Sequence, residues 1–205
     1  MRKICQYFFS PISPWSYLGH ARFVALAKQH GVQIEVRPLD MGKVFAVSGG
    51  LPLAKRAPQR QAYRLTELAR WSEFLQLPIN AQPKFFPVSP DAASKLIIAT
   101  RLALGVEVAL DLSQAIMRAL WAEEKNIGDA DTLAQIANSC ELDGRMLLKS
   151  SDTASVQAEY DRNTDDGIAA NVFGAPWYVV EGEGFWGQDR LDFLERAFCR
   201  QADQL

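Results

Sequence analysis

Apolar and polar positions at the start of the chain predict a strand, a helix and a second strand. Residues 4–9 are mostly aromatic and aliphatic, which is typical of a buried strand. Residues 14–29 predict a helix, and Gly31 is placed to end it. Residues 32–38 alternate apolar and polar side chains, which indicates a half-buried strand. We therefore expect one β-α-β unit, followed by a loop at residues 48–52.

The middle of the chain has a helical pattern from about residue 57 to residue 170. Apolar side chains recur there at spacings of three and four residues. Clear examples are Leu65, Leu68, Trp71 and Leu75, then Leu112, Ile116 and Leu120, and then Leu133, Ile136, Ala137 and Cys140. Pro90 and Gly105 are placed to open and to end one helix, and residues 153–170 predict the last of the region. Residues 77–89 hold three prolines and predict an interrupting loop.

Strand patterns return near the end of the chain. Residues 175–180 and 185–186 predict a short hairpin, with a glycine-containing turn at residues 181–184 between them. Residues 188–200 place apolar side chains on one face and predict a closing helix.

The order of these elements predicts an α/β fold. A β-α-β unit, a long helical stretch and a β-β-α ending together indicate a thioredoxin-like domain that is divided by a large, all-helical insertion. The two halves of the thioredoxin-like domain must meet for the sheet to form. We therefore expect residues 1–50 and 170–205 to make that domain, and residues 51–169 to make the helical insertion.

Composition narrows the classes of function. The chain has 205 residues, 48% of them hydrophobic, and a net charge of −2 without a basic run, so neither a nucleic-acid partner nor an anionic membrane surface is expected. No apolar stretch approaches the roughly 18 residues that span a bilayer. The N-terminus leads directly into a strand and lacks a signal-like apolar core, so we expect a cytoplasmic protein.

The cysteines predict neither disulfides nor a metal site. Cys5, Cys140 and Cys199 are odd in number and far apart, and no Cys-x-x-Cys motif or Cys/His cluster is present. Each lies in an apolar pattern and is expected to be a small buried hydrophobic side chain. His20 and His30, on the first predicted helix, are expected to be structural.

The junction between the first strand and the first helix is the main candidate for chemistry. Ser13-Pro14-Trp15-Ser16 has the layout of a Cys-x-x-Cys redox motif in which hydroxyls replace both sulfurs. Serine before a helix and proline at its first position are also favourable helix-start residues, so a plain helix cap explains the same pattern. The residues alone leave both interpretations open, and they exclude dithiol chemistry at this motif. Ser16 is expected to have a packing or capping role.

Four segments, in order along nearly the whole chain, resemble one known family. They are Phe9-x-x-x-Ser13-Pro14-Trp15-Ser16-Tyr17-Leu18, Leu68-Ala69-Arg70-Trp71, Val172-Phe173-Gly174-Ala175-Pro176 and Phe185-Trp186-Gly187-Gln188-Asp189-Arg190-Leu191. The chain resembles the glutathione-dependent 2-hydroxychromene-2-carboxylate isomerases, which share the DsbA-like fold with the kappa-class glutathione transferases.

This resemblance implies a cofactor, glutathione, and a set of residues that hold it. Ser13 would hold the glutathione sulfur as a thiolate and is the implied catalytic residue. Ala175-Pro176 would be a cis-proline position whose backbone pairs with the glutathione peptide, and Asp189 would pair with the ligand's ammonium group. The further implied contacts are Trp186, Gly187 and Gln188 beside Asp189, and Arg60.

The substrate implied by the resemblance is a small aromatic carboxylate. Lys43, Lys55 and Arg56 are the basic candidates for its carboxylate group, and Phe85 is the candidate for an aromatic wall. The chain departs from the family pattern at Ser10, where an acidic residue is common, and at Gly50, where asparagine is usual.

The implied activity is the glutathione-dependent cis-trans isomerisation between 2-hydroxychromene-2-carboxylate and trans-o-hydroxybenzylidenepyruvate, a step of aromatic catabolism. Two alternatives stand beside it: a kappa-type glutathione transferase or peroxidase, and a non-catalytic thioredoxin-like binding module. The resemblance also implies a homodimer, because members of the family are commonly dimeric.

Overall fold

The structure, a computed structural model, describes residues 3–200. Its strands are β1 (Ile4–Phe9), β2 (Gln33–Pro38), β3 (Trp177–Val180) and β4 (Glu183–Trp186). Its helices are α1 (Pro14–Gln29), α2 (Met41–Ser48), α3 (Pro58–Leu75), α4 (Asp91–Leu104), α5 (Val106–Trp121), α6 (Ala130–Ser139), α7 (Gly144–Ser151), α8 (Ala154–Ala169) and α9 (Leu191–Cys199), with a 3-10 turn, η1, at Leu53–Lys55.

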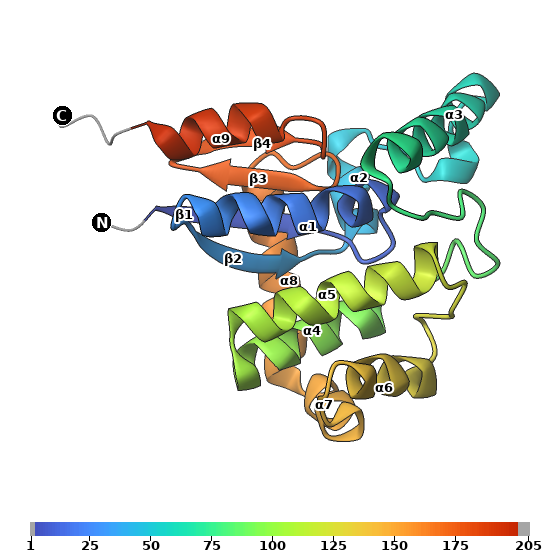
Figure 1. Ribbon diagram of the computed structural model, residues 1–205. Helices are drawn as coiled ribbons and strands as arrows, with labels where there is room; N and C mark the ends of the chain where they lie inside the picture. Colours follow the sequence, from blue (N-terminus) through green and yellow to red (C-terminus); the bar gives the residue numbers. More distant parts are fainter. Residues whose placement is uncertain (1–2, 201–205) are drawn as a thin grey trace.

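The sheet is mixed, in the order β2-β1-β3-β4. β1 runs parallel to β2, as a β-α-β unit requires, and antiparallel to β3, while β3 and β4 form a hairpin. Figure 1 shows α1 crossing one face of this sheet and α8 lying behind it, with α4 to α7 gathered beyond β2. This is the thioredoxin-like sheet with a helical region between β2 and β3 that the order of the elements predicts.

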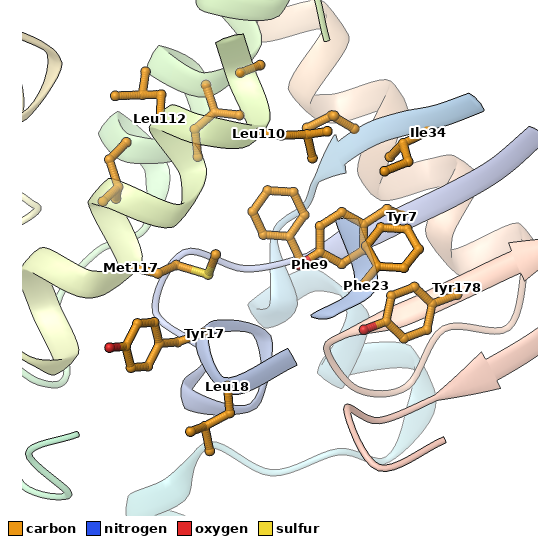
Figure 2. Close-up of a cluster of buried hydrophobic side chains, with 14 of the residues drawn as sticks. Tyr7, Phe9, Tyr17, Leu18, Phe23, Ile34, Leu110, Leu112, Met117 and Tyr178 are labelled. Atoms are coloured by element: carbon orange, nitrogen blue, oxygen red, sulfur yellow. The ribbon is translucent and has the colours of Figure 1, made fainter. Parts of the chain in front are cut away.

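Alternation along β1 divides the core between the two faces of the sheet. Tyr7 and Phe9 point to the α1 face, where their rings stack at 4.5 Å and Tyr7 also stacks on Tyr178 at 5.5 Å (Figure 2). Phe8 points to the other face and packs with Leu39 and other apolar residues beneath α8. The strand is therefore buried on both sides, which its near-continuous apolar sequence reflects.

The helical region shares its core with the sheet. Figure 2 shows Leu110, Leu112 and Met117 of α5 on the side of the α1 face where Phe9 lies. These residues belong to one buried hydrophobic cluster together with Tyr7 and Phe9. The division of the chain into two units at residues 50 and 170 stays a prediction, and its outermost residues, 1–2 and 201–205, lie outside the described part.

Local signals explain where the elements begin and end. The predicted strand 4–9, helix 14–29 and loop 77–89 are confirmed. The pattern missed α2, a helix of two turns whose start is fixed by Asp40: its carboxylate accepts hydrogen bonds from Gly42 N at 2.7 Å and Lys43 N at 3.3 Å. Gly49 ends α2 in the left-handed conformation, with φ of 74°.

Other boundaries differ by a few residues. The pattern gave α7 no element of its own, although Asp143 caps it by accepting from Met146 N. The hairpin turn is shorter than predicted because β4 already begins at Glu183, and α9 begins at Leu191, three residues later than predicted. No helix among residues 3–200 is both long enough and apolar enough to cross a bilayer.

The cysteines are free, but they are not all buried. Cys5 is fully buried in β1, and Cys140 is half-buried. Cys199 is exposed, so its predicted burial is wrong: it is the last residue of α9, where the helix turns its sulfur away from the apolar face and towards His30 Nδ1, 3.7 Å away.

Candidate functional site

Ser13 is the N-cap of α1, as the helix-cap interpretation expects. Its backbone is extended, with φ of −82° and ψ of 120°, and Pro14 follows at the first helical position. The Ser13 hydroxyl oxygen accepts a hydrogen bond from Ser16 N at 3.2 Å. The cap thus satisfies one backbone N–H of the first turn and places the hydroxyl at the positive end of the helix dipole.

The same hydroxyl also reaches across the molecule. Ser13 Oγ donates to the carbonyl oxygen of Ala175 at 3.0 Å, although the two residues are 162 positions apart in sequence. The Ala175-Pro176 peptide bond is cis. The helix cap therefore touches the segment before β3, and the structure brings together two groups of residues that the sequence analysis assigned to one site.

The segment after β4 joins the site through the backbone. Gly187 N donates to Pro176 O at 3.0 Å, which sets residues 186–189 beside the cis-proline. Gly187 has φ of 99°, a conformation that favours glycine, and a side chain there would meet Asp189 Oδ1 at 2.5 Å. Trp186 is 52% exposed and packs edge-on against Phe173 at 4.8 Å. An exposed aromatic surface therefore borders Ala175-Pro176.

Gln188 and Asp189 face opposite environments. The Gln188 side chain is buried, and both its Oε1 atom and its backbone oxygen accept from the guanidinium of Arg22. A side chain on Gly19 would meet Gln188 Cβ at 2.7 Å, so the segment packs closely on α1. Asp189 is exposed and pairs with its neighbour Arg190 at 2.7 Å. Asp189 thus presents a carboxylate to solvent, whereas both oxygens of Gln188 are engaged by Arg22.

The other serines of the junction do not share the role of Ser13. Ser16 is fully buried, and its hydroxyl has no hydrogen-bond partner among the described residues. Ser10, at one of the departures from the family pattern, is likewise buried with a hydroxyl that lacks a partner there. Of the three, only the Ser13 hydroxyl is both hydrogen-bonded and part-exposed.

The loop at residues 77–89 is fastened to the start of α1. Tyr17 OH donates to Pro78 O at 2.9 Å, and Asn80 N donates to Trp121 O at 2.6 Å at the end of α5. Figure 1 shows this loop and α3 on the same side of the molecule as the start of α1. Phe85, the predicted aromatic wall, is a half-buried residue of this loop.

The basic candidates lie in different surroundings. Lys55 and Arg60 are exposed on η1 and α3. Arg56 is half-buried, donates to Leu51 O at 2.8 Å and lies over the Phe45 ring. Lys43 is exposed and pairs with Asp161 of α8 at 2.8 Å, and this carboxylate raises the pKa of Lys43. Lys43 is thus directed towards α8, and the other three gather at the start of α3.

One residue of this region has no counterpart in the sequence predictions. Arg64 of α3 is half-buried, with its guanidinium 5.3 Å from the Phe86 ring and 5.6 Å from the Trp121 ring. Burial lowers the pKa of Arg64 to about 10, and the charge of Arg56 adds to the effect. The sequence offered one signal that could have pointed to Arg64: it lies four residues after Arg60, so the two arginines share one face of the helix.

No cluster that suits a metal ion occurs in the described part of the chain: residues 3–200 contain no group of three or more His, Cys, Asp or Glu side chains placed to hold one. His20, the buried histidine, has a structural role. Its Nε2 atom bonds to Leu110 O at 3.0 Å and its Nδ1 atom to Tyr7 OH at 3.1 Å.

Sequence comparisons identify the family. The family of DSBA-like thioredoxin domains matches residues 5–198. A 2-hydroxychromene-2-carboxylate isomerase from Sphingobium xenophagum is 30% identical, covering 95% of this chain and 97% of that protein. Glutathione S-transferase kappa 2 from Caenorhabditis elegans is 26% identical, covering 96% of this chain and 94% of that protein.

Comparison with solved structures confirms the fold. The structure of a 2-hydroxychromene-2-carboxylate isomerase matches with a TM-score of 0.80 at 24% identity, covering 95% of this chain and 93% of that chain. The thioredoxin-like fold expected from the order of the elements is thereby confirmed, and so is the resemblance drawn from the four segments. The chain belongs to the family of DSBA-like thioredoxin domains and, within it, to the 2-hydroxychromene-2-carboxylate isomerases.

Proposed function

We propose that this protein is a glutathione-dependent isomerase that interconverts 2-hydroxychromene-2-carboxylate and trans-o-hydroxybenzylidenepyruvate. The observation on which the proposal rests most is the position of the Ser13 hydroxyl, at the N-terminus of α1 and within hydrogen-bond distance of Ala175. A sulfur placed beside this hydroxyl would lie at the positive end of the helix dipole and within reach of a hydroxyl donor. It would also lie next to the backbone that precedes β3.

Ser13 and the helix terminus together can supply the thiolate. A free thiol has a pKa of about 8.5, and lowering it by two units takes about 2.7 kcal/mol. A helix N-terminus contributes about 0.3–1 kcal/mol, and up to ~2 kcal/mol in a favourable site. A hydrogen bond to a charged group contributes about 1.5–3 kcal/mol. Dipole and hydroxyl together reach the required stabilisation, so glutathione is the nucleophile and Ser13 activates it.

Binding of glutathione changes the partner of the Ser13 proton. The hydroxyl now donates to the Ala175 carbonyl. In the proposed complex it turns to the sulfur, and the Ala175 carbonyl becomes free to accept the N–H of the glutathione peptide. Ser16 N continues to donate to Ser13 Oγ, so the cap that orients the hydroxyl is kept.

The proposed reaction needs no oxidant and no second substrate. The thiolate adds to the conjugated system of the ring-opened substrate, and the electron pair moves into an enolate. The former double bond is then single and rotates. Elimination reforms the double bond in the trans isomer and returns the thiolate, so atoms and electrons balance.

The remaining predicted contacts complete the proposal. Asp189, exposed beside Ala175-Pro176, would pair with the ammonium of glutathione, with Trp186, Gly187 and Arg60 as further contacts. Gln188 would contribute its backbone N–H, because its side-chain and backbone oxygens both accept from Arg22.

The substrate would lie against the Phe85 loop, with Lys55 and Arg56 near its carboxylate. Lys43 would first have to leave Asp161. Exposed ion pairs are worth only about 0.2–1 kcal/mol, so this is a small cost. We also propose a homodimer in the cytoplasm, which sedimentation of the purified protein and fractionation of cells would test.

Kappa-type transferase or peroxidase activity is the second candidate, and the kappa relative favours it. The deciding experiment follows chromene isomerisation with and without glutathione, beside conjugation of chlorodinitrobenzene. Fast glutathione-dependent isomerisation with slow conjugation supports the proposal, and the reverse result supports the transferase. If calorimetry detects no glutathione binding at millimolar concentration, the non-catalytic binding module is favoured instead.

A further inference from the structure

Three arginines near the start of α3 form a basic cluster that lacks acidic partners. Arg56, Arg60 and Arg64 follow one another at intervals of four residues. No ion pair involves any of the three among residues 3–200. The charge of Arg60 lowers the pKa of Arg56, and the charge of Arg56 lowers the pKa of Arg64, after the larger effect of burial in each case. A bound anion would reduce the repulsion between such neighbouring positive charges and would therefore be stabilised there.

Arg64 is the most strongly constrained member of the cluster. One of its terminal nitrogens, Nη2, is buried without a hydrogen-bond partner among the described residues. The Phe86 and Trp121 rings lie 4.9 Å apart, and both face the guanidinium. Packing on two aromatic rings fixes the plane of the guanidinium, whereas its charge is matched by no acid. A guanidinium held in this way is ready to bind a planar anion.

The surroundings of Arg64 connect to Ser13 through hydrogen-bonded contacts. Tyr17 lies one helical turn after Ser13 and holds the loop at Pro78. Trp121 holds the same loop at Asn80, and Phe86 belongs to that loop. Figure 1 shows the start of α1, the loop, α3 and the end of α5 on one side of the molecule. A ligand bound at Ser13 therefore lies near a loop that is fastened to the same turn of α1, and Arg64 packs on Phe86 of that loop.

We propose that Arg64 binds the carboxylate of the aromatic substrate, with its guanidinium packed against the Phe86 and Trp121 rings. This rests on the proposed function, because it assumes an aryl carboxylate as substrate. A planar carboxylate can accept two parallel N–H donors of arginine, which a lysine does not provide. Half-buried Phe86 offers an apolar neighbour for the ring of such a ligand, and fully buried Trp121 supports the guanidinium.

Exposed Lys55 and half-buried Arg56 stay in the neighbourhood of the carboxylate, but they and the other basic residues fit the direct two-donor contact less well than Arg64. Lys43 is engaged with Asp161, and Arg56 already donates to Leu51 O. Arg60 is exposed, without the aromatic packing that Arg64 has, which suits a contact to a carboxylate of glutathione better. Of the cluster, Arg64 alone combines a missing acid partner with two aromatic neighbours.

The test uses two probes of nearly equal shape, trans-cinnamate and its neutral amide cinnamamide. Their binding is measured by ligand-observed NMR titration. The wild-type protein should bind cinnamate about tenfold or more tightly than cinnamamide. Arg64→Gln should remove this preference, and Arg64→Lys should keep only part of it. Arg70→Gln is the matched control, because Arg70 lies on the same helix, exposed and paired with Glu67. The control should keep the preference.

Calorimetry with glutathione tests whether Arg64 binds a carboxylate of glutathione instead of the substrate carboxylate. Arg64→Gln should bind glutathione within about twofold of wild type. A variant that loses glutathione affinity but keeps its preference for cinnamate would overturn the assignment, as would a wild-type protein that does not distinguish the two probes. Neither probe requires turnover, so this binding test is independent of the isomerisation assay. The assignment of Arg64 can be supported when isomerisation is absent, and it can be contradicted when isomerisation is present.

Discussion

The hydroxyl of Ser13 donates to the carbonyl of Ala175 across 3.0 Å and accepts from Ser16 N across 3.2 Å. Helix cap and candidate catalytic group are therefore one side chain, with its acceptor side used by α1 and its proton directed towards the cis-proline segment. The two interpretations of the Ser13-Pro14-Trp15-Ser16 junction are compatible, because the cap is what orients the proton. Loss of the hydroxyl should then affect stability and chemistry together.

Ser13→Ala should destabilise the protein and slow the reaction. Removal of the cap lowers the free energy of unfolding by about 0.5–2 kcal/mol. Loss of a hydrogen bond to the thiolate should lower kcat/KM by about ten- to a hundredfold, since such bonds are worth about 1.5–3 kcal/mol. Urea unfolding and steady-state kinetics of isomerisation measure the two effects.

Ser16→Ala is the matched control for Ser13→Ala. The Ser16 hydroxyl is buried without a partner, so its removal should leave the free energy of unfolding equal or higher and kcat/KM near the wild-type value. Equal losses of activity in the two variants would contradict a special role for Ser13.

Substitutions at Gln188 and Asp189 should have different effects, the first on the stability of the fold and the second on glutathione binding. Gln188→Ala leaves the guanidinium of Arg22 without its side-chain acceptor, which should lower the free energy of unfolding by about 1–3 kcal/mol with little change in glutathione affinity. Asp189→Asn should change stability by less than about 0.5 kcal/mol but weaken glutathione binding. Thermal unfolding and calorimetry on both variants check this, and the opposite pattern would show that Gln188 contacts the ligand.

His20 should make stability depend on pH below neutrality. Burial lowers the pKa of His20 to about 4, while its ordinary value is about 6.5. Between these values the unfolded chain binds a proton that the folded protein excludes, so the contribution of His20 to stability is present above pH 6.5 and is lost as the pH falls towards 4. The loss is of the order of 3 kcal/mol.

Urea unfolding of the wild-type protein and of His20→Gln, at a series of pH values, tests this. The variant should show a flatter dependence than the wild-type protein between pH 6.5 and 4. Identical slopes for His20→Gln and wild type would contradict the assignment.

The three cysteines should react in the order of their exposure. The thiolate is the reactive form, and burial raises the pKa of both Cys5 and Cys140. Iodoacetamide should therefore label exposed Cys199 first, half-buried Cys140 more slowly and Cys5 only on unfolding. Mass spectrometry of timed samples measures the order, and rapid labelling of Cys5 in the native protein would contradict its burial.

Sequence patterns predicted elements better than they predicted contacts. β1 and α1 were predicted to the residue, because apolar runs, Pro14 and Gly31 mark them clearly. α2 was missed, because a helix of two turns offers little periodicity and its start depends on the cap made by Asp40.

The site depends on contacts that spacing does not encode. Ser13 and Ala175 meet because β1 and β3 pair in the sheet, and only the family resemblance pointed to both. Arg64 was not among the residues singled out from the sequence. Its role depends on Phe86 and Trp121, which are distant in sequence and come together only when the loop packs against α5.

The most direct test of Ser13 is a titration of the thiol of bound glutathione, followed by the ultraviolet absorption of the thiolate. In the wild-type protein this pKa should lie about two units below the ordinary thiol value of about 8.5. In Ser13→Ala, at saturating glutathione, it should return most of the way to that value. The same pKa for glutathione bound to both proteins would contradict the claim that Ser13 activates the thiol.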